Sequence, residues 1–400
     1  MDAIVTDVHL RSAVAGVRAL AAKRRVMAVG PTWSAPGLWS RRVAARAVAP
    51  DLLEDRAGFA AAVAGHAREH GPLVVYPGWE GAVDAILDAS PPMPPEVIWP
   101  YASRAALDLV RDKRRLASLA ENAGLRAPRT LLEGTAGELA GSPLPHRCIV
   151  KAAEPGGAVE QTDCVESEDE LRALLRRLPR EQPLLLQERL EGPLTALALV
   201  LARDGTAVAR FQQRARRTWP LGAGPSSLAV SVAPDEDLVA RAAGMLAGVG
   251  YWGLAQLQFI DDPEGPALID VNVRFYGSLP LALACGVDLP GAWHAVTVGD
   301  ALPAPGPYRE GVTYRWLEAD ISAALQGQPS SDALLRRSPK PRVGAMWSLD
   351  DPIPSLLLGG RAVTDRVRRR IVAPARRRLI RDRARSPRSV PAREEPGPDG

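Results

Sequence analysis

The stretch that decides the fold lies between residues 268 and 280, and its sequence is Leu268-Ile269-Asp270-Val271-Asn272-Val273-Arg274-Phe275-Tyr276-Gly277-Ser278-Leu279-Pro280. Apolar and polar residues alternate through its first half, which predicts a half-buried β-strand. Asp270, Asn272 and Arg274 then share one face. The residues expected to face the core are Ile269, Val271 and Val273. A carboxylate and an amide oxygen suit Mg²⁺, and a guanidinium can hold a phosphate or a developing anion. The alternative is a half-buried strand whose polar face meets only solvent.

Lysines are scarce in this chain, which makes their positions informative. Only four of the 50 basic residues are lysines. Lys113 stands at the start of a helical pattern, and Lys151 closes the apolar run 148–150 ahead of Gly156 and Gly157. A lysine ammonium is a compact charge on a flexible stem and suits phosphate oxygens. The two lysines therefore indicate where a nucleotide site should be sought.

Composition limits the class of protein. With 400 residues and 46% hydrophobic content, the chain exceeds the needs of one core, so two or three packed units are expected. Three distant cysteines predict a reducing cytosol, with neither a disulfide framework nor a zinc site. There is no run of about 18 uncharged apolar residues, and the acidic start is unlike a signal peptide. These features predict a cytoplasmic protein without a transmembrane segment.

The net charge of +4 comes from the end of the chain. Residues 361–400 hold thirteen arginines and five acids, which leaves about −4 for residues 1–360. This distribution argues against a nucleic-acid footprint over the whole surface. The arginine-rich segment suits contact with an anionic surface, and the alternative is a solvated helix followed by disorder.

The order of the expected elements predicts the fold class. Residues 1–108 alternate short apolar runs with amphipathic stretches, as in an α/β domain with a parallel sheet. A helix over 103–123 opens an α+β region over 109–300, whose two subdomains are expected at 109–190 and 191–300. Antiparallel hairpins are predicted there around Asp204-Gly205 and around 261–265. A small C-terminal extension over 301–360 and a basic, partly disordered tail over 361–400 complete the expected organisation.

Four motifs in this order resemble those of the ATP-grasp carboxylate–amine ligases, and the resemblance covers about residues 1–300. They are Asp112-Lys113 ahead of Gly124 and Pro128; Ile149-Val150-Lys151 ahead of Gly156-Gly157; Gln187-Glu188-Arg189-Leu190-Glu191-Gly192; and Asp270-x-Asn272-x-Arg274-Phe275-Tyr276-Gly277-Ser278. In the last motif the family more often has glutamate in place of Asp270. A single such motif is weak evidence, whereas the ordered set is specific.

The resemblance implies a site for ATP between two α+β halves, with adenine against the backbone of a hinge and ribose near Glu191. The implied nucleotide-binding residues are Lys113, Lys151, Gly156, Gly157, Gln187, Glu188, Leu190 and Glu191. It also implies Mg²⁺, with Mn²⁺ as an alternative, held by Asp270 and Asn272. A small-molecule carboxylate would take the γ-phosphoryl group, and a small-molecule amine would attack the acyl phosphate. Arg274 and Lys151 have the implied catalytic roles, and a homodimer is the default assembly.

Gln258 departs from the family pattern. It stands where the family usually has a metal-binding glutamate, and a neutral amide binds Mg²⁺ less strongly. This substitution leaves open a catalytically weak, ATP-binding regulator. A bicarbonate-using carboxylase-type enzyme is a further alternative, although the chain has no Met-Lys-Met biotin-acceptor signal.

Substrate contacts are expected from two other places. Residues 210–227 combine arginines, glycines and hydroxyls, which predicts a loop over phosphate and acidic substrate, or else a solvated connector. The candidate substrate residues are Arg214, Arg216, Ser226 and Ser278. Thr6-Asp7 and Trp79-Glu80 follow expected strands and are candidates for the acceptor pocket.

Overall fold

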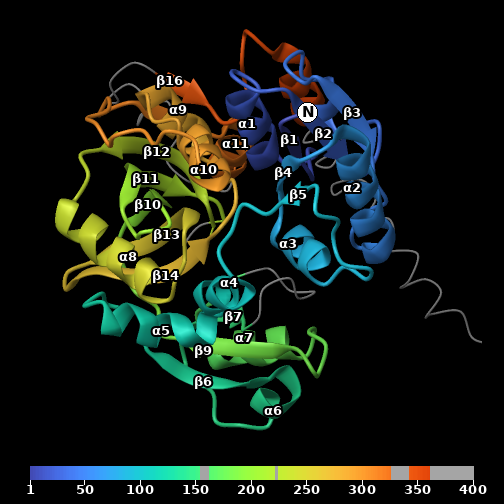
Figure 1. Cartoon of the computed structure of the whole chain (residues 1–400). Coiled ribbons are helices and arrows are strands. Elements are labelled where there is room, and N and C mark those ends of the chain that lie inside the picture. Colours follow the sequence, from blue (N-terminus) through green and yellow to red (C-terminus); the bar gives the residue numbers. More distant parts are fainter. Residues whose placement is uncertain (154–161, 221–223, 326–341, 361–400) are drawn as a thin grey trace, which may run out of the picture.

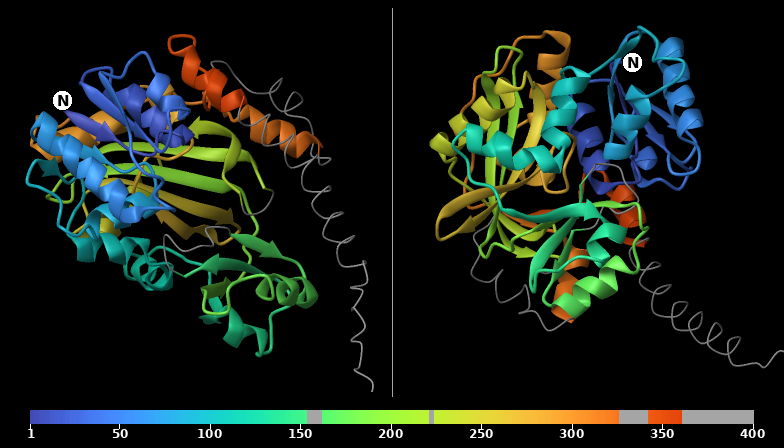
Figure 2. Two further views of the ribbon diagram at one scale, coloured as in Figure 1. Left: turned by 90° about the vertical axis from the view of Figure 1, so that its right-hand side faces the viewer. Right: turned by 90° about the horizontal axis from the view of Figure 1, so that it is seen from below.

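The protein is described by a computed structural model over residues 1–153, 162–220, 224–325 and 342–360, and within these residues it has three β-sheets (Figure 1). The predicted α/β front and α+β body are confirmed. Figure 2 shows the first sheet packed beside the largest sheet, with the four-stranded sheet forming a lobe of its own.

The first sheet is parallel and five-stranded, with strand order β3-β2-β1-β4-β5. Its strands are β1 (Ala3–Val5), β2 (Val26–Gly30), β3 (Ala45–Val48), β4 (Leu73–Tyr76) and β5 (Val97–Ile98). The helices that accompany it are α1 (Arg11–Leu20), η1 (Pro36–Trp39), α2 (Arg56–His70) and α3 (Glu80–Leu87). After β1 the chain adds β2 and β3 on one side of β1, and it then crosses over to add β4 and β5 on the other side of β1. The loops after these two strands therefore flank a topological switch point, where α/β proteins bind ligands.

The prediction of a single helix over 103–123 is wrong. Two helices occur there, α4 (Arg104–Arg111) and α5 (Lys113–Asn122), and Asp112 separates them with an extended backbone (ψ 107°). The Asp112 carboxylate accepts a hydrogen bond from the backbone N–H of Arg114, so Asp112 acts as the N-cap of α5. The break places Lys113 in the first turn of a new helix.

The four-stranded sheet is antiparallel, in the order β6-β9-β7-β8. Its elements are β6 (Thr130–Thr135), α6 (Ala136–Ala140), β7 (Cys148–Ala152), β8 (Asp163–Val165), α7 (Glu168–Leu175) and β9 (Pro183–Gln187). Buried leucines of α7 and β9 form a small hydrophobic core with Val150 and Val165. This lobe therefore has a core of its own.

The largest sheet has seven strands, in the order β14-β13-β10-β11-β12-β15-β16. Its elements are β10 (Leu194–Leu201), β11 (Ala207–Thr218), β12 (Ser226–Val232), α8 (Glu236–Gly248), β13 (Gly253–Asp262), β14 (Gly265–Asn272), α9 (Leu279–Cys285), α10 (Leu289–Val298), β15 (Thr313–Arg315), α11 (Leu317–Leu325) and β16 (Arg342–Gly344). The two hairpins expected from the sequence occur as β10–β11 and β13–β14. The C-terminal extension contributes β15, which pairs with β12.

The prediction of a loop over 210–227 is wrong for most of this segment. Its first half continues β11 to Thr218, and its end begins β12 at Ser226. The pairing of β11 with both β10 and β12 explains the difference, because backbone hydrogen bonds on two sides favour a strand despite a polar sequence.

One hydrophobic core joins the first sheet to the seven-stranded sheet. At its centre Tyr76, Phe275 and Trp293 pack together, with ring centroids 4.7–5.6 Å apart. Arg274, which directly precedes Phe275, is consequently fixed against the first sheet. Among the described residues no single helix could cross a membrane by length and hydropathy, and only the bent pair α9 and α10, at 94° to each other, reaches that composition together.

Candidate active site

A cavity of about 550 Å³ lies between the four-stranded and seven-stranded sheets and reaches the start of α1. Described residues from all four predicted motifs line it, together with Gln258. They are Lys113, Lys151, Gln187, Glu188, Leu190, Gln258, Asp270, Asn272 and Arg274. Segments more than 150 residues apart in the sequence thus meet at one cavity.

Lys151 occupies the base of the cavity on β7. Its side chain is buried, and its ammonium donates a hydrogen bond to the Ile269 carbonyl on β14 at 2.9 Å. Burial lowers its pKa to about 8, while the Asp270 carboxylate raises it and Lys113 lowers it further. An ammonium has three donors, so two remain for a ligand. The pair of lysines makes this end of the cavity suited to phosphate.

Asp270 lies opposite Gln258 across the β13–β14 hairpin, and Asn272 lies opposite Gln256. Directly opposed residues in an antiparallel pair share a face, and all four side chains line the cavity. The Asn272 amide donates to Asp270 Oδ2 at 3.2 Å, which leaves the amide oxygen for another partner. Gln256 was not predicted as a site residue.

The prediction for residues 269–274, which placed alternate side chains on the two faces of one strand, is wrong at Ile269 and at Arg274. The register shifts between Gln258 and Phe259, so Ile269 lies in a β-bulge. Ile269 lines the cavity and is only partly buried, whereas Val271 and Val273 face the core as expected. Arg274 lies just beyond β14, which ends at Asn272.

The oxygen ligands at this hairpin fit one divalent ion that is shared with phosphates. Mg²⁺ in proteins typically takes one or two carboxylates and completes its shell with substrate phosphates and water. Asp270 supplies one carboxylate, and Asn272 and Gln258 supply neutral amide oxygens. The described residues contain no cluster of three or more His, Cys, Asp or Glu side chains that could hold a metal by itself.

Arg274 is positioned by an ion-pair network of residues from α3 and α4. Its Nε lies 3.3 Å from Glu80 Oε1, and the other carboxylate oxygen of Glu80 accepts from Arg111 Nε at 2.8 Å. Arg111 is almost fully buried and also donates twice to Asp84, at 2.8 and 2.9 Å. The guanidinium of Arg274 is therefore fixed at the edge of the cavity.

Gln187 and Leu190 also line the cavity, at the end of β9 and just after it. Glu188 is already engaged with Arg129, because its backbone N–H donates to the Arg129 carbonyl at 3.0 Å. Its carboxylate accepts from the backbone and side chain of Arg129. Donors for a purine must therefore come from Gln187 or from residues after Glu188.

Several predicted site residues do not line the cavity. Glu191 is exposed and pairs with Arg147 at 2.5 Å. Arg214 pairs with Asp261 at 2.6 Å and, like Arg216, projects from the exposed face of β11. Ser226 and Ser278 are buried and do not line the cavity, although their neighbours Pro225 and Gly277 do. Gly156 and Gly157 lie outside the described residues, as does the tail 361–400.

Residues from α1 line the cavity although the sequence did not indicate them. Leu10, Arg11 and Ser12 lie at the start of this helix. Trp79, one of the acceptor-pocket candidates, also lines it. Asp7 does not: it lies in a separate cavity of about 80 Å³, with a left-handed backbone (φ 55°). Burial raises the pKa of Asp7 to about 6, although hydrogen bonds from Thr6 and Gly78 lower it.

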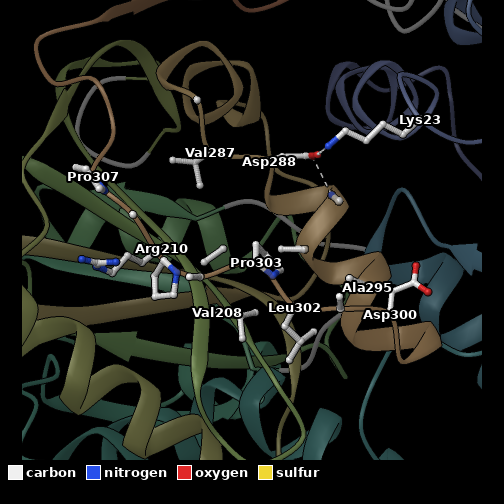
Figure 3. A pocket seen from close by; sticks show the side chains of 18 of the residues that line it. Lys23, Val208, Arg210, Val287, Asp288, Ala295, Asp300, Leu302, Pro303 and Pro307 are labelled. Atoms are coloured by element: carbon white, nitrogen blue, oxygen red, sulfur yellow. Dashed lines mark hydrogen bonds and ion pairs between the residues drawn. The ribbon is translucent and has the colours of Figure 1, made fainter.

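A further cavity of about 480 Å³ lies between the end of α1, the start of β11, α10 and residues 300–307 (Figure 3). Its walls are mostly alanine, valine and proline. At its edge Lys23 pairs with Asp288 at 3.4 Å, and Arg210 pairs with Glu236 at 2.6 Å. None of the predicted site residues lines it.

Comparison with known proteins agrees with this geometry. Residues 180–320 match the family described as ATP-grasp in the biosynthetic pathway with Ter operon. The biotin carboxylase domain of the Hydrogenobacter thermophilus 2-oxoglutarate carboxylase superposes with a TM-score of 0.58 at 16% identity, covering 78% of this chain and 73% of its own. The chain has the ATP-grasp fold.

Other ATP-grasp structures are similar to a comparable extent. The L-amino acid ligase from Bacillus licheniformis has a TM-score of 0.52 at 16% identity and covers 74% of each chain. The N5-carboxyaminoimidazole synthetase from Staphylococcus aureus has a TM-score of 0.57 at 13% identity, covering 77% of this chain and 80% of its own. No curated protein matches the chain in sequence.

Proposed function

We propose that the protein is an ATP-dependent ligase that activates a carboxylate as an acyl phosphate and joins it to an amine. The observation that supports this most is that Lys113, Lys151 and the Asp270–Asn272 edge of β14 line one cavity large enough for a nucleotide. ATP-grasp structures of ligases are among those similar in fold.

Different residues of the cavity would bind the phosphates, the adenine and the metal ion. Lys113 and Lys151 hold the triphosphate by charge-assisted hydrogen bonds. Adenine would lie toward Gln187 and Leu190, which line the same cavity. Asp270 and Asn272 would hold a Mg²⁺ ion together with the phosphates, and that ion would supply positive charge against the negative charge that develops during transfer.

The reaction would proceed in two steps, which are phosphorylation of the carboxylate and attack of the amine on the acyl phosphate. A carboxylate oxygen of the first substrate attacks the γ-phosphorus, the bond to the β–γ bridging oxygen breaks, and ADP leaves. The amine, in its neutral form, then attacks the acyl carbon, and the bond from that carbon to the phosphoryl-bearing oxygen breaks. Inorganic phosphate leaves with this oxygen of the original carboxylate, and the proton lost by the amine passes to water. Arg274, fixed by Glu80 at 3.3 Å, stabilises the negative charge in both steps.

Gln258 favours a second candidate, an ATP-binding protein with slow turnover. The side chain opposite Asp270 carries no charge, so the metal is held by fewer carboxylates than in the family pattern. This candidate predicts nucleotide binding in the absence of ligation.

An oxygen-transfer experiment tests the proposal. The protein is incubated with ATP, Mg²⁺, an amine and a panel of carboxylates labelled with ¹⁸O in the carboxyl group. The phosphate released is analysed by mass spectrometry. Ligation predicts one ¹⁸O atom in each phosphate and loss of the label transfer in Arg274→Ala. Release of unlabelled phosphate would show attack by water, and binding of ATP without phosphate release across the panel would favour the slow-turnover candidate.

A further inference from the structure

Arg11 is held in the cavity without an anionic partner among the described residues. Its Nη1 donates to the Tyr314 hydroxyl at 2.8 Å, and its guanidinium carbon lies 3.6 Å from the centre of the Trp316 ring. The Tyr314 hydroxyl in turn donates to the Gly277 carbonyl at 2.9 Å. Stacking and hydrogen bonding orient the guanidinium, and neither neutralises its charge.

Ser12 lies next to Arg11 and has an unused hydroxyl. The residue is 7% exposed, lines the same cavity and makes no side-chain hydrogen bond within the described chain. A ligand oxygen at this point would accept a hydrogen bond from this hydroxyl.

The start of α1 adds backbone donors at the same place. Leu10 is the N-cap and has no side chain able to cap the helix, and the first turn contains no acidic residue. The first N–H groups of a helix carry partial positive charge and bind anions when no cap occupies them. The Arg11 guanidinium, the Ser12 hydroxyl and the first backbone N–H groups of α1 are therefore all hydrogen-bond donors on one side of the cavity.

The neighbouring glycine permits the approach of Arg11. A side-chain β-carbon at Gly277 would lie 2.4 Å from Arg11 Nη2, so any other residue there would displace the guanidinium. Gly277 follows Arg274 by three residues, and both line the cavity. Glu80 neutralises Arg274 from the side of α3, whereas Arg11 keeps its full charge.

We propose that Arg11, Ser12 and the start of α1 form a binding site for a second carboxylate of the substrate, distinct from the carboxylate that is phosphorylated. This inference rests on the proposed function. One of the two joined molecules is then a dicarboxylate or an amino acid. The planar guanidinium fits a carboxylate with two parallel hydrogen bonds, and the hydroxyl and backbone N–H groups complete the set.

A binding experiment tests the site without requiring turnover. Isothermal titration is performed with the full chain, saturated with a non-hydrolysable ATP analogue and Mg²⁺. The probes are linear dicarboxylates from malonate to adipate and the α-amino acids, each paired with the analogue in which one carboxylate is an amide. At least one acid should bind more tightly than its amide. Arg11→Ala should weaken that binding roughly tenfold or more.

Three further variants separate binding from folding. Arg11→Lys should retain part of the affinity, and Ser12→Ala should weaken it by a few fold. Arg203→Ala is the matched control, because Arg203 also stacks on a tryptophan (Trp252, 4.1 Å) and donates to a backbone carbonyl, but it does not line the cavity. It should bind the acid as the parent does. All variants should bind the ATP analogue equally.

The outcomes distinguish this site from the proposed reaction. Equal binding of acids and amides, no binding by any probe, or parental affinity in Arg11→Ala would overturn the site, whether or not ligation occurs. Carboxylate binding that depends on Arg11, without ¹⁸O transfer in the oxygen-transfer assay, would leave the site standing and overturn the ligase function. If both hold, Arg11→Ala should raise the KM for the anionic substrate and leave the KM for ATP unchanged.

Discussion

Lys151 differs from an exposed lysine because its ammonium is buried between two sheets. Its pKa of about 8 lies far below the ordinary value of about 10.4. The side chain is charged at neutral pH, and that charge is lost as the pH rises through about 8. Triphosphate binding favours the charged form, so nucleotide affinity and the charge of Lys151 are coupled.

This coupling predicts a pH dependence. Affinity for an ATP analogue should fall roughly tenfold between pH 7 and pH 9, because the free protein must then take up a proton. Titration calorimetry at several pH values measures the effect. Lys151→Arg keeps its charge throughout and should give a flatter profile. An equally steep profile in that variant would assign the pH dependence to another group.

The neutral side chain opposite Asp270 predicts a gain of metal affinity in Gln258→Glu. A second carboxylate at this position should lower the Mg²⁺ concentration needed for half-maximal nucleotide binding by roughly tenfold, the effect of one added charged ligand. Gln256→Glu places the same charge opposite Asn272 and is the matched comparison. Equal effects of the two changes would mean that overall charge matters and position does not.

At the scale of elements, one polar residue, Asp112, separates α4 from α5 and changes the direction of the backbone between them. Asp112 ends one helix and caps the next, so that Arg111 pairs with residues of α3 while Lys113 lines the cavity. Arg111 joins Glu80 and Asp84 of α3. A buried arginine held by two carboxylates is costly to remove, because the carboxylates are left without a partner.

Two arginines of α4 should therefore differ in their contribution to stability. Arg111→Ala should lower the free energy of unfolding by about 3–5 kcal/mol. Arg104→Ala should lower it by less than about 1 kcal/mol, because Arg104 pairs with Asp88 and Asp108 in solvent. Urea denaturation followed by circular dichroism measures both. Similar losses in the two variants would show that the buried network adds nothing beyond surface pairing.

At the scale of the whole molecule, the first sheet and the seven-stranded sheet behave as one unit because they share a core. Gly16 of α1 lies at this junction. A β-carbon there would be 2.4 Å from the Phe275 ring. The residue before Phe275 is Arg274, so packing at the junction and placement of this cavity-lining arginine depend on each other.

Two helical glycines test this dependence. Gly16→Ala should destabilise the protein by about 1–3 kcal/mol through overpacking and should also reduce turnover. Gly65→Ala in α2 has open space around the new methyl group and should be neutral or stabilise by up to about 1 kcal/mol. Thermal unfolding and the phosphate-release assay give the two readouts. A stable, fully active Gly16→Ala protein would contradict the close packing.

The same junction predicts a pH dependence of stability. His294 Nδ1 lies 3.0 Å from the Tyr76 hydroxyl, and burial together with Arg24 lowers the pKa of His294 to about 4, against opposing effects of Asp300 and Asp2. The unfolded chain takes up the proton near pH 6.5, so this residue lowers stability as the pH falls from about 6.5 toward 4. His294→Gln does not titrate and should lose less stability between pH 7 and pH 5. Equal losses would show that His294 is not responsible.

The sequence by itself determined the fold class, most strands and the lysine and β14 motifs, because alternation and motif order are local properties of the chain. Only the tertiary structure decided which of those residues meet. The β-bulge at Ile269 and the extension of β11 depend on neighbouring strands, which no local pattern encodes. Arg11 meets Tyr314 and Trp316, about 300 positions away, only in the folded chain, because the fold and not the local sequence brings a charge to its partners.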